Sequence, residues 1–132
     1  MRVKNPRIRT KVDGYKIFRR SRMFSERIGE IILHHHERYG GQGYPGGLKR
    51  KEIASLACII MVADVYDALT SDKPYRLAYP PHEAREMLNN WSGELFDPEV
   101  TDVFLENLAA YPVGSHVILN NGESGLIVSS TP

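Results

Sequence analysis

The sequence predicts a mainly α-helical protein, a helical bundle followed by a small β-hairpin. Apolar residues recur at the three- and four-residue spacing of helices in several segments between residues 11 and 110. Prolines and a glycine-rich stretch separate these segments, as expected at helix boundaries. After residue 111 the pattern changes to two short apolar runs around an Asn-Gly turn, which is typical of a hairpin. We therefore expect a basic arm at 1–10, a helical domain at 11–110 and a hairpin tail at 111–132.

The first two predicted helices lead to a run of histidines. Residues 11–21 place apolar side chains near one helical stripe, and a second helix is expected to begin after Ser25, a residue type suited to helix N-caps. The i, i+3, i+4, i+7 spacing of one buried face is followed by Ile28, Ile31, Ile32 and His35. We expect the three histidines at 34–36 to occupy the last turns of this helix, with at least His35 directed inward.

A glycine-rich loop follows the histidines. Five of the eight residues from Gly40 to Gly47 are glycine, a composition that ends the helix and lets backbone approach a ligand closely. The segment 41–46 also satisfies the G-x-G-x-x-G pattern of dinucleotide-binding folds. That pattern must follow a strand and open a helix. Here it follows a helix and contains Pro45, so we reject this interpretation.

The longest apolar segment, residues 49–70, predicts the central helix of the core. One helical stripe contains Ile53, Leu56, Ala57, Ile60, Met61, Asp64, Val65, Ala68 and Leu69. A carboxylate on a buried face is costly unless a metal or a cation meets it. We therefore expect Asp64 to be buried and to face such a partner. Two shorter helices are expected to begin near Pro81 and Pro98, because proline suits the first helical turn.

Composition and charge limit the class of protein. With 132 residues, 42% of them hydrophobic and 25% charged, the chain has the composition of one soluble globular domain. Residues 1–27 carry ten Lys or Arg against two acids, and residues 28–132 carry seven against fourteen. A basic arm can contact nucleic acid or an anionic membrane surface. A solvated basic helix face near the acidic half is the simpler interpretation, so no nucleic-acid partner is expected.

Cysteine usage and hydropathy indicate a cytoplasmic protein. The single cysteine, Cys58, excludes an internal disulfide and lies in an apolar run, where we predict a core residue in a reducing compartment. No run of eighteen apolar residues is present, so no membrane span is expected. The first residues lack the apolar core of a signal peptide. We expect a cytoplasmic chain, or a piece of a larger protein whose anchor lies elsewhere.

Residue types alone favour a metal site near the histidines. His35, His36 and Asp64 combine imidazole and carboxylate ligands, the set used by hydrolytic Fe, Mn or Zn centres. A single histidine is more often a solvated or core residue. Three histidines, a glycine-rich loop and a carboxylate within an apolar helix together favour function. Neighbouring histidines on a helix diverge by about 100°, so they can reach two metals, or one metal and a substrate phosphate.

Two long motifs resemble those of the HD-GYP domain family. The segment from His35 to Pro45, HHERYGGQGYP, resembles the family signature HHExxDGxGYP. The segment from Val62 to Arg76 resembles a second signature, VADVYDALTSxRPYR, and residues 94–98 match a later Phe-Asp-Pro element. The resemblance covers residues 10 to 110 and implies the C-terminal part of an HD-type helical bundle.

This resemblance also implies an activity and a site. HD-GYP proteins are metal-dependent phosphodiesterases that open cyclic di-GMP, with two or three iron or manganese ions that would lower the pKa of a bridging water. By resemblance, His35, His36 and Asp64 are metal ligands, and Asp64 belongs to the catalytic centre. The loop Gly43-Tyr44-Pro45 corresponds to the region implicated in contact with a signalling protein partner.

Charged residues after the central helix suggest where the phosphate of a cyclic di-GMP or related cyclic dinucleotide would bind. Lys73 and Arg76 flank Tyr75 in the second motif. From charge and position, we expect Lys73 to act as a catalytic cation and Arg76 to bind the substrate phosphate.

The sequence lacks part of the expected ligand set. The His-Asp pair that names the family is missing, no histidine precedes His34, and Gly40 stands where the signature has an acid. One hypothesis is the C-terminal part of a cyclic di-GMP phosphodiesterase, inactive alone because its other ligands come from another segment or chain. The other is a non-catalytic signalling module that binds a partner protein or a cyclic dinucleotide through the Gly-Tyr-Pro loop. Either a truncated copy of a longer protein or a short protein that has lost catalysis would fit.

Overall fold

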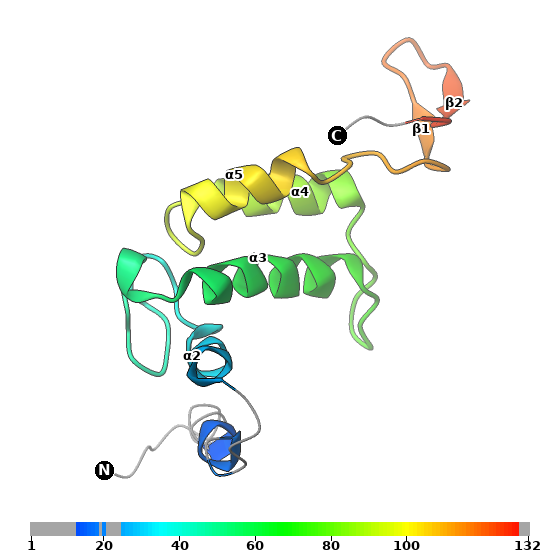
Figure 1. The fold of residues 1–132 in the computed structure, drawn as a ribbon. Coiled ribbons are helices and arrows are strands. Elements are labelled where there is room, and N and C mark those ends of the chain that lie inside the picture. The colour runs from blue at the N-terminus through cyan, green and yellow to red at the C-terminus, as the bar shows by residue number, and fades with distance from the viewer. Residues whose placement is uncertain (1–12, 19, 21–24, 130–132) are drawn as a thin grey trace.

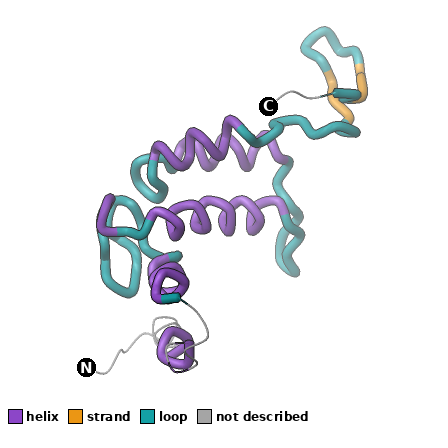
Figure 2. The backbone as a smooth tube through the Cα atoms, in the orientation of Figure 1, coloured by secondary structure: helices purple, strands orange, loops and turns teal. Residues whose placement is uncertain are grey.

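One central helix organises the fold. The computed structural model describes residues 13–18, 20 and 25–129. Helix α3, Ser55–Thr70, lies in the middle, with α2 (Glu26–His34) on one side and α4 (Pro81–Asn90) and α5 (Pro98–Glu106) on the other (Figure 1). Two short strands stand beyond α4 and α5 (Figure 2). The predicted mainly α-helical fold with a C-terminal hairpin is confirmed.

Helices α4 and α5 begin where the prolines predict. Pro81 and Pro98 occupy the first turns of the two helices, and Asp97 caps α5 by accepting a hydrogen bond from the backbone N–H of Glu99 at 2.9 Å. The guanidinium of Arg85 on α4 donates to the backbone carbonyls of Leu105 and, at 2.8 Å, of Leu108. Arg85 therefore ties α4 to the C-terminal end of α5.

The C-terminal hairpin consists of two three-residue strands. Strand β1 (His116–Ile118) pairs antiparallel with β2 (Ser124–Leu126), and Val117 lies opposite Gly125. Gly122 in the connecting turn has a φ of 88°, a conformation that glycine adopts without strain.

The core lies between α3, α4 and α5. Its buried side chains are Ile53, Ala57, Cys58, Met61, Val62, Leu88, Phe96 and Leu105. The prediction that Cys58 is a core residue is confirmed. None of the helices among the described residues is long and apolar enough to span a membrane.

Two predicted helix boundaries are wrong. The segment 49–70 is not one helix, because a 3₁₀ turn at Arg50–Glu52 and extended backbone at Ile53 precede α3. Arg50 has a positive φ of 50°, and its N–H bonds the carbonyl of Tyr39 in the preceding loop, so this segment belongs to the loop. Helix α2 ends at His34, which leaves His36 beyond the helix instead of in its last turn.

The first predicted helix is described in part. Residues 13–18 and 20 are helical, whereas residues 11, 12, 19 and 21 and the basic arm lie outside the described residues. Gly29 of α2 is buried, and a β-carbon there would meet the ring of Tyr15 at 2.8 Å and that of Phe18 at 3.3 Å. The first helix therefore packs its aromatic side chains on the glycine of α2.

Candidate functional site

The histidines mark the end of helix α2. His35 is the C-cap, with its backbone N–H bonded to the carbonyl of Ile31 at 3.0 Å. The N–H of Glu37 bonds the carbonyl of His34 at 2.9 Å, and the chain then leaves the helix direction. The three histidines are therefore placed by the end of one helix and the turn that follows it.

Three rings contact one another in sequence beside this helix end, one pair tilted and the other stacked. The centroids of His35 and His36 are 4.2 Å apart with 42° between the planes. The ring of Tyr44 stacks on that of His36, with centroids 5.2 Å apart and 19° between the planes. The Gly-Tyr-Pro loop thus contacts one of the two predicted ligand histidines directly.

A buried glutamate holds the glycine loop. Glu37 is 1% exposed, and its carboxylate accepts hydrogen bonds from the N–H of Gly46 at 2.6 Å and of Leu48 at 3.0 Å. The sequence motif contains Glu37, but no role is predicted for it from the sequence alone. One available signal is its position before a glycine-rich loop, where many backbone N–H groups need acceptors.

The loop approaches Glu37 so closely that it requires glycine. A β-carbon on Gly43 would overlap the backbone of Glu37 and Arg38. The N–H of Tyr44 bonds the carbonyl of His36 at 3.1 Å, and the Tyr44–Pro45 peptide is cis. Glycine at position 43 therefore allows the chain to fold back onto the residues that follow α2.

Asp64 is exposed, and the prediction that it is buried is wrong. The buried face of α3 is formed by Ala57, Cys58, Met61, Val62 and Leu69. Leu56 and Ile60, which share the predicted stripe with Asp64, are 51% and 42% exposed. Helix α3 has apolar residues around nearly its whole circumference, so periodicity alone does not identify the buried side. Because Asp64 meets solvent, its carboxylate carries no cost of burial in the described chain.

Lys73 and Arg76 lie in the turn after α3. Their backbones pair with each other, at 2.9 and 3.2 Å. The guanidinium of Arg76 donates to the carbonyls of Ala68 at 2.5 Å and Leu69 at 3.2 Å, and lies 4.7 Å from the ring centroid of Tyr79. Arg76 thus satisfies carbonyls at the end of α3, which have no partner within the helix.

The predicted metal ligands do not form a complete site. Their imidazole and carboxylate groups are suitable donors for iron or manganese. Within residues 13–18, 20 and 25–129, however, no group of three or more His, Cys, Asp or Glu side chains is arranged to hold a metal ion. The Nδ1 atom of His34 is buried and has no hydrogen-bond partner among the described residues. His35, His36 and Asp64 therefore do not fit a two- or three-metal centre by themselves.

The shifted pKa values lie in the core. Burial, followed by the charge of Asp97, raises the pKa of the Cys58 thiol. Burial also raises the pKa of Tyr66, whose ring packs edge-on against Phe104. A raised thiol pKa disfavours the nucleophilic thiolate. Cys58 is therefore a packing residue and no candidate nucleophile.

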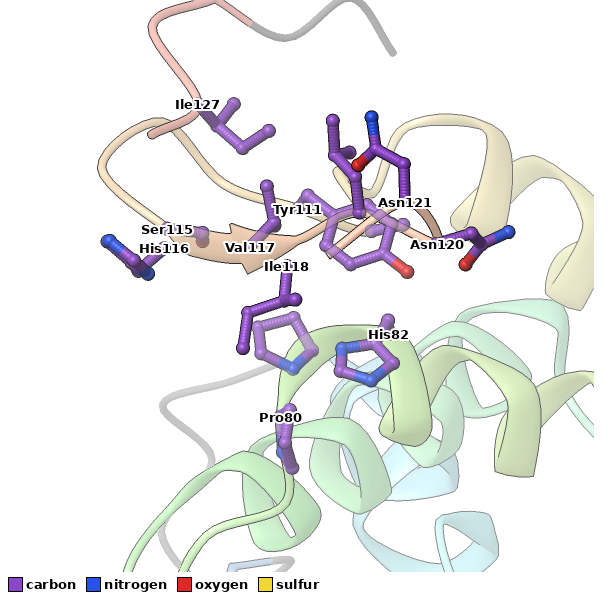
Figure 3. Close-up of a pocket in the computed structure, with 13 residues that line it drawn as sticks. Pro80, His82, Tyr111, Ser115, His116, Val117, Ile118, Asn120, Asn121 and Ile127 are labelled. Atoms are coloured by element: carbon purple, nitrogen blue, oxygen red, sulfur yellow. The ribbon is translucent and has the colours of Figure 1, made fainter. Parts of the chain in front are cut away.

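An open cavity of about 1120 Å³ lies elsewhere, between the start of α4 and the hairpin (Figure 3). Two of the residues that line it, His82 and Tyr111, stack with ring centroids 5.2 Å apart. Among the described residues, the cavity lining includes no predicted site residue and no Lys, Arg, Asp or Glu. This lining provides no fixed charge for a phosphodiester.

Comparison with known proteins identifies the family. Residues 13–100 match the HD domain family. The chain belongs to the HD domain family. Its two signature motifs are those of the HD-GYP type, as the sequence predicts. The chain is 40% identical over 116 residues to a cyclic di-GMP phosphodiesterase of Pseudomonas aeruginosa, a match that covers 88% of this chain and 28% of the relative.

Two further similar proteins are also described as phosphodiesterases. A cyclic di-GMP phosphodiesterase of Thermotoga maritima is 44% identical over 94 residues, which cover 70% of this chain and 26% of that protein. The crystal structure of a cyclic GMP-AMP specific phosphodiesterase of V. cholerae matches with a TM-score of 0.54 and 30% identity, and covers 67% of this chain and 20% of that one. The chain therefore spans about a quarter of the length of the curated relatives described here.

Proposed function

We propose that this chain forms part of a cytoplasmic, metal-dependent phosphodiesterase that opens cyclic di-GMP or a related cyclic dinucleotide. The remaining metal donors come from another segment or chain. Membership of the HD domain family supports the proposal, as do relatives described as cyclic di-GMP and 3'3'-cGAMP phosphodiesterases. In this proposal His35, His36 and Asp64 are ligands of iron or manganese.

An exposed apolar face beside Asp64 supports the part of the proposal in which another segment or chain completes the site. Leu56, Ile59 and Ile60 on α3 are 51%, 47% and 42% exposed. A helix that is apolar on all sides is normally covered. Asp64 lies one helical turn beyond Ile60, so an element packed on this face would enclose the carboxylate and bring its own donors close to it.

The two cations after α3 have different parts in this proposal. Arg76 is engaged with carbonyls at the end of α3, so binding of substrate phosphate would have to share its guanidinium with them. Lys73 makes no side-chain hydrogen bond or ion pair with the residues that the structure describes. We therefore assign the charge that stabilises the reacting phosphodiester to Lys73 first, and a supporting contact to Arg76.

The experiment compares the isolated chain with a completed one. We expect the 132-residue chain with Mn²⁺ or Fe²⁺ to show no turnover of cyclic di-GMP. A chimera that joins the preceding part of the Thermotoga maritima relative to this chain should hydrolyse the nucleotide and lose activity in the His36→Ala variant. Turnover by the isolated chain that His36→Ala abolishes would contradict the need for further donors. A folded, metal-loaded chimera without hydrolysis would contradict the phosphodiesterase assignment.

A second candidate is a non-catalytic signalling module that binds through the Gly-Tyr-Pro loop. The bracing of this loop by Glu37 and His36 favours it, because a preorganised loop loses less entropy on binding. Calorimetry of the isolated chain with cyclic di-GMP separates the two possible ligands. Heat of binding without hydrolysis supports nucleotide binding, whereas no heat at millimolar nucleotide leaves a protein partner.

A further inference from the structure

Glu37 is the one charged side chain among the described residues that is fully buried. A buried carboxylate is costly unless its oxygens are hydrogen-bonded. Here each oxygen has its own donor, because Oε1 accepts from Gly46 and Oε2 accepts from Leu48. Within the described part of the chain, no ion pair involves Glu37. Its contacts are thus directed entirely at the backbone of the loop.

These bonds join parts of the chain that are distant in sequence. The two donors lie nine and eleven residues after Glu37. Between them and Glu37, the loop folds back at Gly43, where a side chain would overlap the Glu37 backbone. The next residue, Tyr44, donates its N–H to the carbonyl of His36 and places its ring on the imidazole. The carboxylate therefore closes the loop around the residue that stacks on His36.

We propose that Glu37 is a positioning residue, which holds the loop from Gly43 to Leu48 in the conformation that keeps the Tyr44 ring against His36. The orientation of the His36 imidazole is then set by a carboxylate that never touches it. That His36 is a metal ligand rests on the proposed function, whereas the positioning itself does not. Loss of the carboxylate should free the loop, separate the two rings and leave the helical core intact.

The Glu37→Gln variant tests this inference. Glutamine keeps the size of the side chain, but its NH₂ group faces one of the two backbone donors and cannot accept from it. We expect the amides of Gly46 and Leu48 to exchange at least about tenfold faster in this variant. Nuclear Overhauser contacts between the Tyr44 and His36 rings should weaken, and the His36 ring-proton shifts should move, while amides of α4 and α5 keep their protection.

The matched control is Glu52→Gln. Glu52 lies on the exposed end of the same loop region and accepts one backbone N–H, that of Lys49, at 2.8 Å. This variant should leave the His36 and Tyr44 signals unchanged. A folded Glu37→Gln protein with wild-type signals and exchange would overturn the proposal, and so would a Glu52→Gln protein with the same losses as Glu37→Gln.

The wild-type chain provides a test that does not depend on folding of the variant. The amides of Gly46 and Leu48 should be protected, since their acceptor is buried. Exchange of both amides at the rate of an unstructured peptide would refute the positioning role. All of these measurements use the metal-free protein without nucleotide, so a failure of the phosphodiesterase assignment does not affect them.

Discussion

The aromatic ring of Tyr44 stacks on the imidazole of His36, with the ring centroids 5.2 Å apart and 19° between their planes. This contact joins the loop predicted to meet a partner to a histidine predicted to bind metal. A backbone hydrogen bond also joins the two residues, because the Tyr44 N–H donates to the His36 carbonyl. A change in the loop therefore reaches His36 through two contacts.

Removing the Tyr44 ring should alter His36 with a small effect on stability. Tyr44→Ala loses a stacked ring pair, for which about 0.5–1.5 kcal/mol beyond the lost burial is typical. Tyr44→Phe keeps the ring and is the control. We expect the His36 ring-proton shifts to move in the alanine variant and to stay near wild type in the phenylalanine variant. Equal shifts in both would show that the stack does not set the environment of His36.

The two aspartates Asp64 and Asp97 should differ in their effects on stability. Asp64 is exposed without a cap role, so Asp64→Ala should change the free energy of unfolding by less than about 0.5 kcal/mol. Asp97 caps α5, and Asp97→Ala should cost about 1 kcal/mol. Urea denaturation of both variants measures the difference. A loss at Asp64 as large as that at Asp97 would mean that its carboxylate has a stabilising partner.

Two leucines should separate core packing from surface contacts. Leu88 is 0% exposed in the core, and Leu88→Ala should lower the free energy of unfolding by about 2–5 kcal/mol through lost burial and a cavity. Leu77 is 83% exposed after α3, so Leu77→Ala should stay within about 0.5 kcal/mol of wild type. Thermal and urea denaturation report both values. Similar losses for the two would contradict the described core.

Arg85 should stabilise the packing of α4 against α5. Arg85→Met keeps much of the apolar stem but removes the charged donor from the carbonyls of Leu105 and Leu108, of which Leu105 still accepts from the Leu108 N–H. Hydrogen bonds from charged groups contribute about 1.5–3 kcal/mol, so a loss of that order is expected. Arg38→Met, at an exposed position, is the matched control. If both variants unfold at the wild-type urea concentration, the Arg85 contacts do not stabilise the fold.

Stability should fall at alkaline pH because of Cys58 and Tyr66. Their folded-state pKa values are raised, so the native state retains protons that the unfolded state releases. The contribution of the Cys58 thiol to the free energy of unfolding is fully present below the unfolded thiol pKa of about 8.5. It is lost as the pH rises through the thiol pKa of the folded state. Tyr66 acts in the same direction from about pH 10. In Cys58→Ala the fall in the free energy of unfolding between about pH 8.5 and about pH 10 should disappear. Urea denaturation from pH 7 to 10.5 measures it.

Local patterns in the sequence predict most of the helices. Pro81 and Pro98 mark the starts of α4 and α5, and the glycines after His36 mark the loop. Boundaries that depend on distant contacts are missed. The 3₁₀ turn at Arg50–Glu52 is one such case, since the N–H of Arg50 donates to the carbonyl of Tyr39 in the preceding loop. Periodicity over residues 49–70 contains no information about that bond.

The HD-GYP motifs, the helical class and the hairpin are predictable from the amino-acid sequence, because they depend on residue types at short spacing. The buried side of α3, and with it the exposure of Asp64, depends on packing between the helices. An apolar helix offers several possible buried faces, and the neighbours α2, α4 and α5 select among them. The stacking of Tyr44 on His36 and the hydrogen bonds from Gly46 and Leu48 to Glu37 also required the folded loop, since bonds across nine and eleven residues follow no local period.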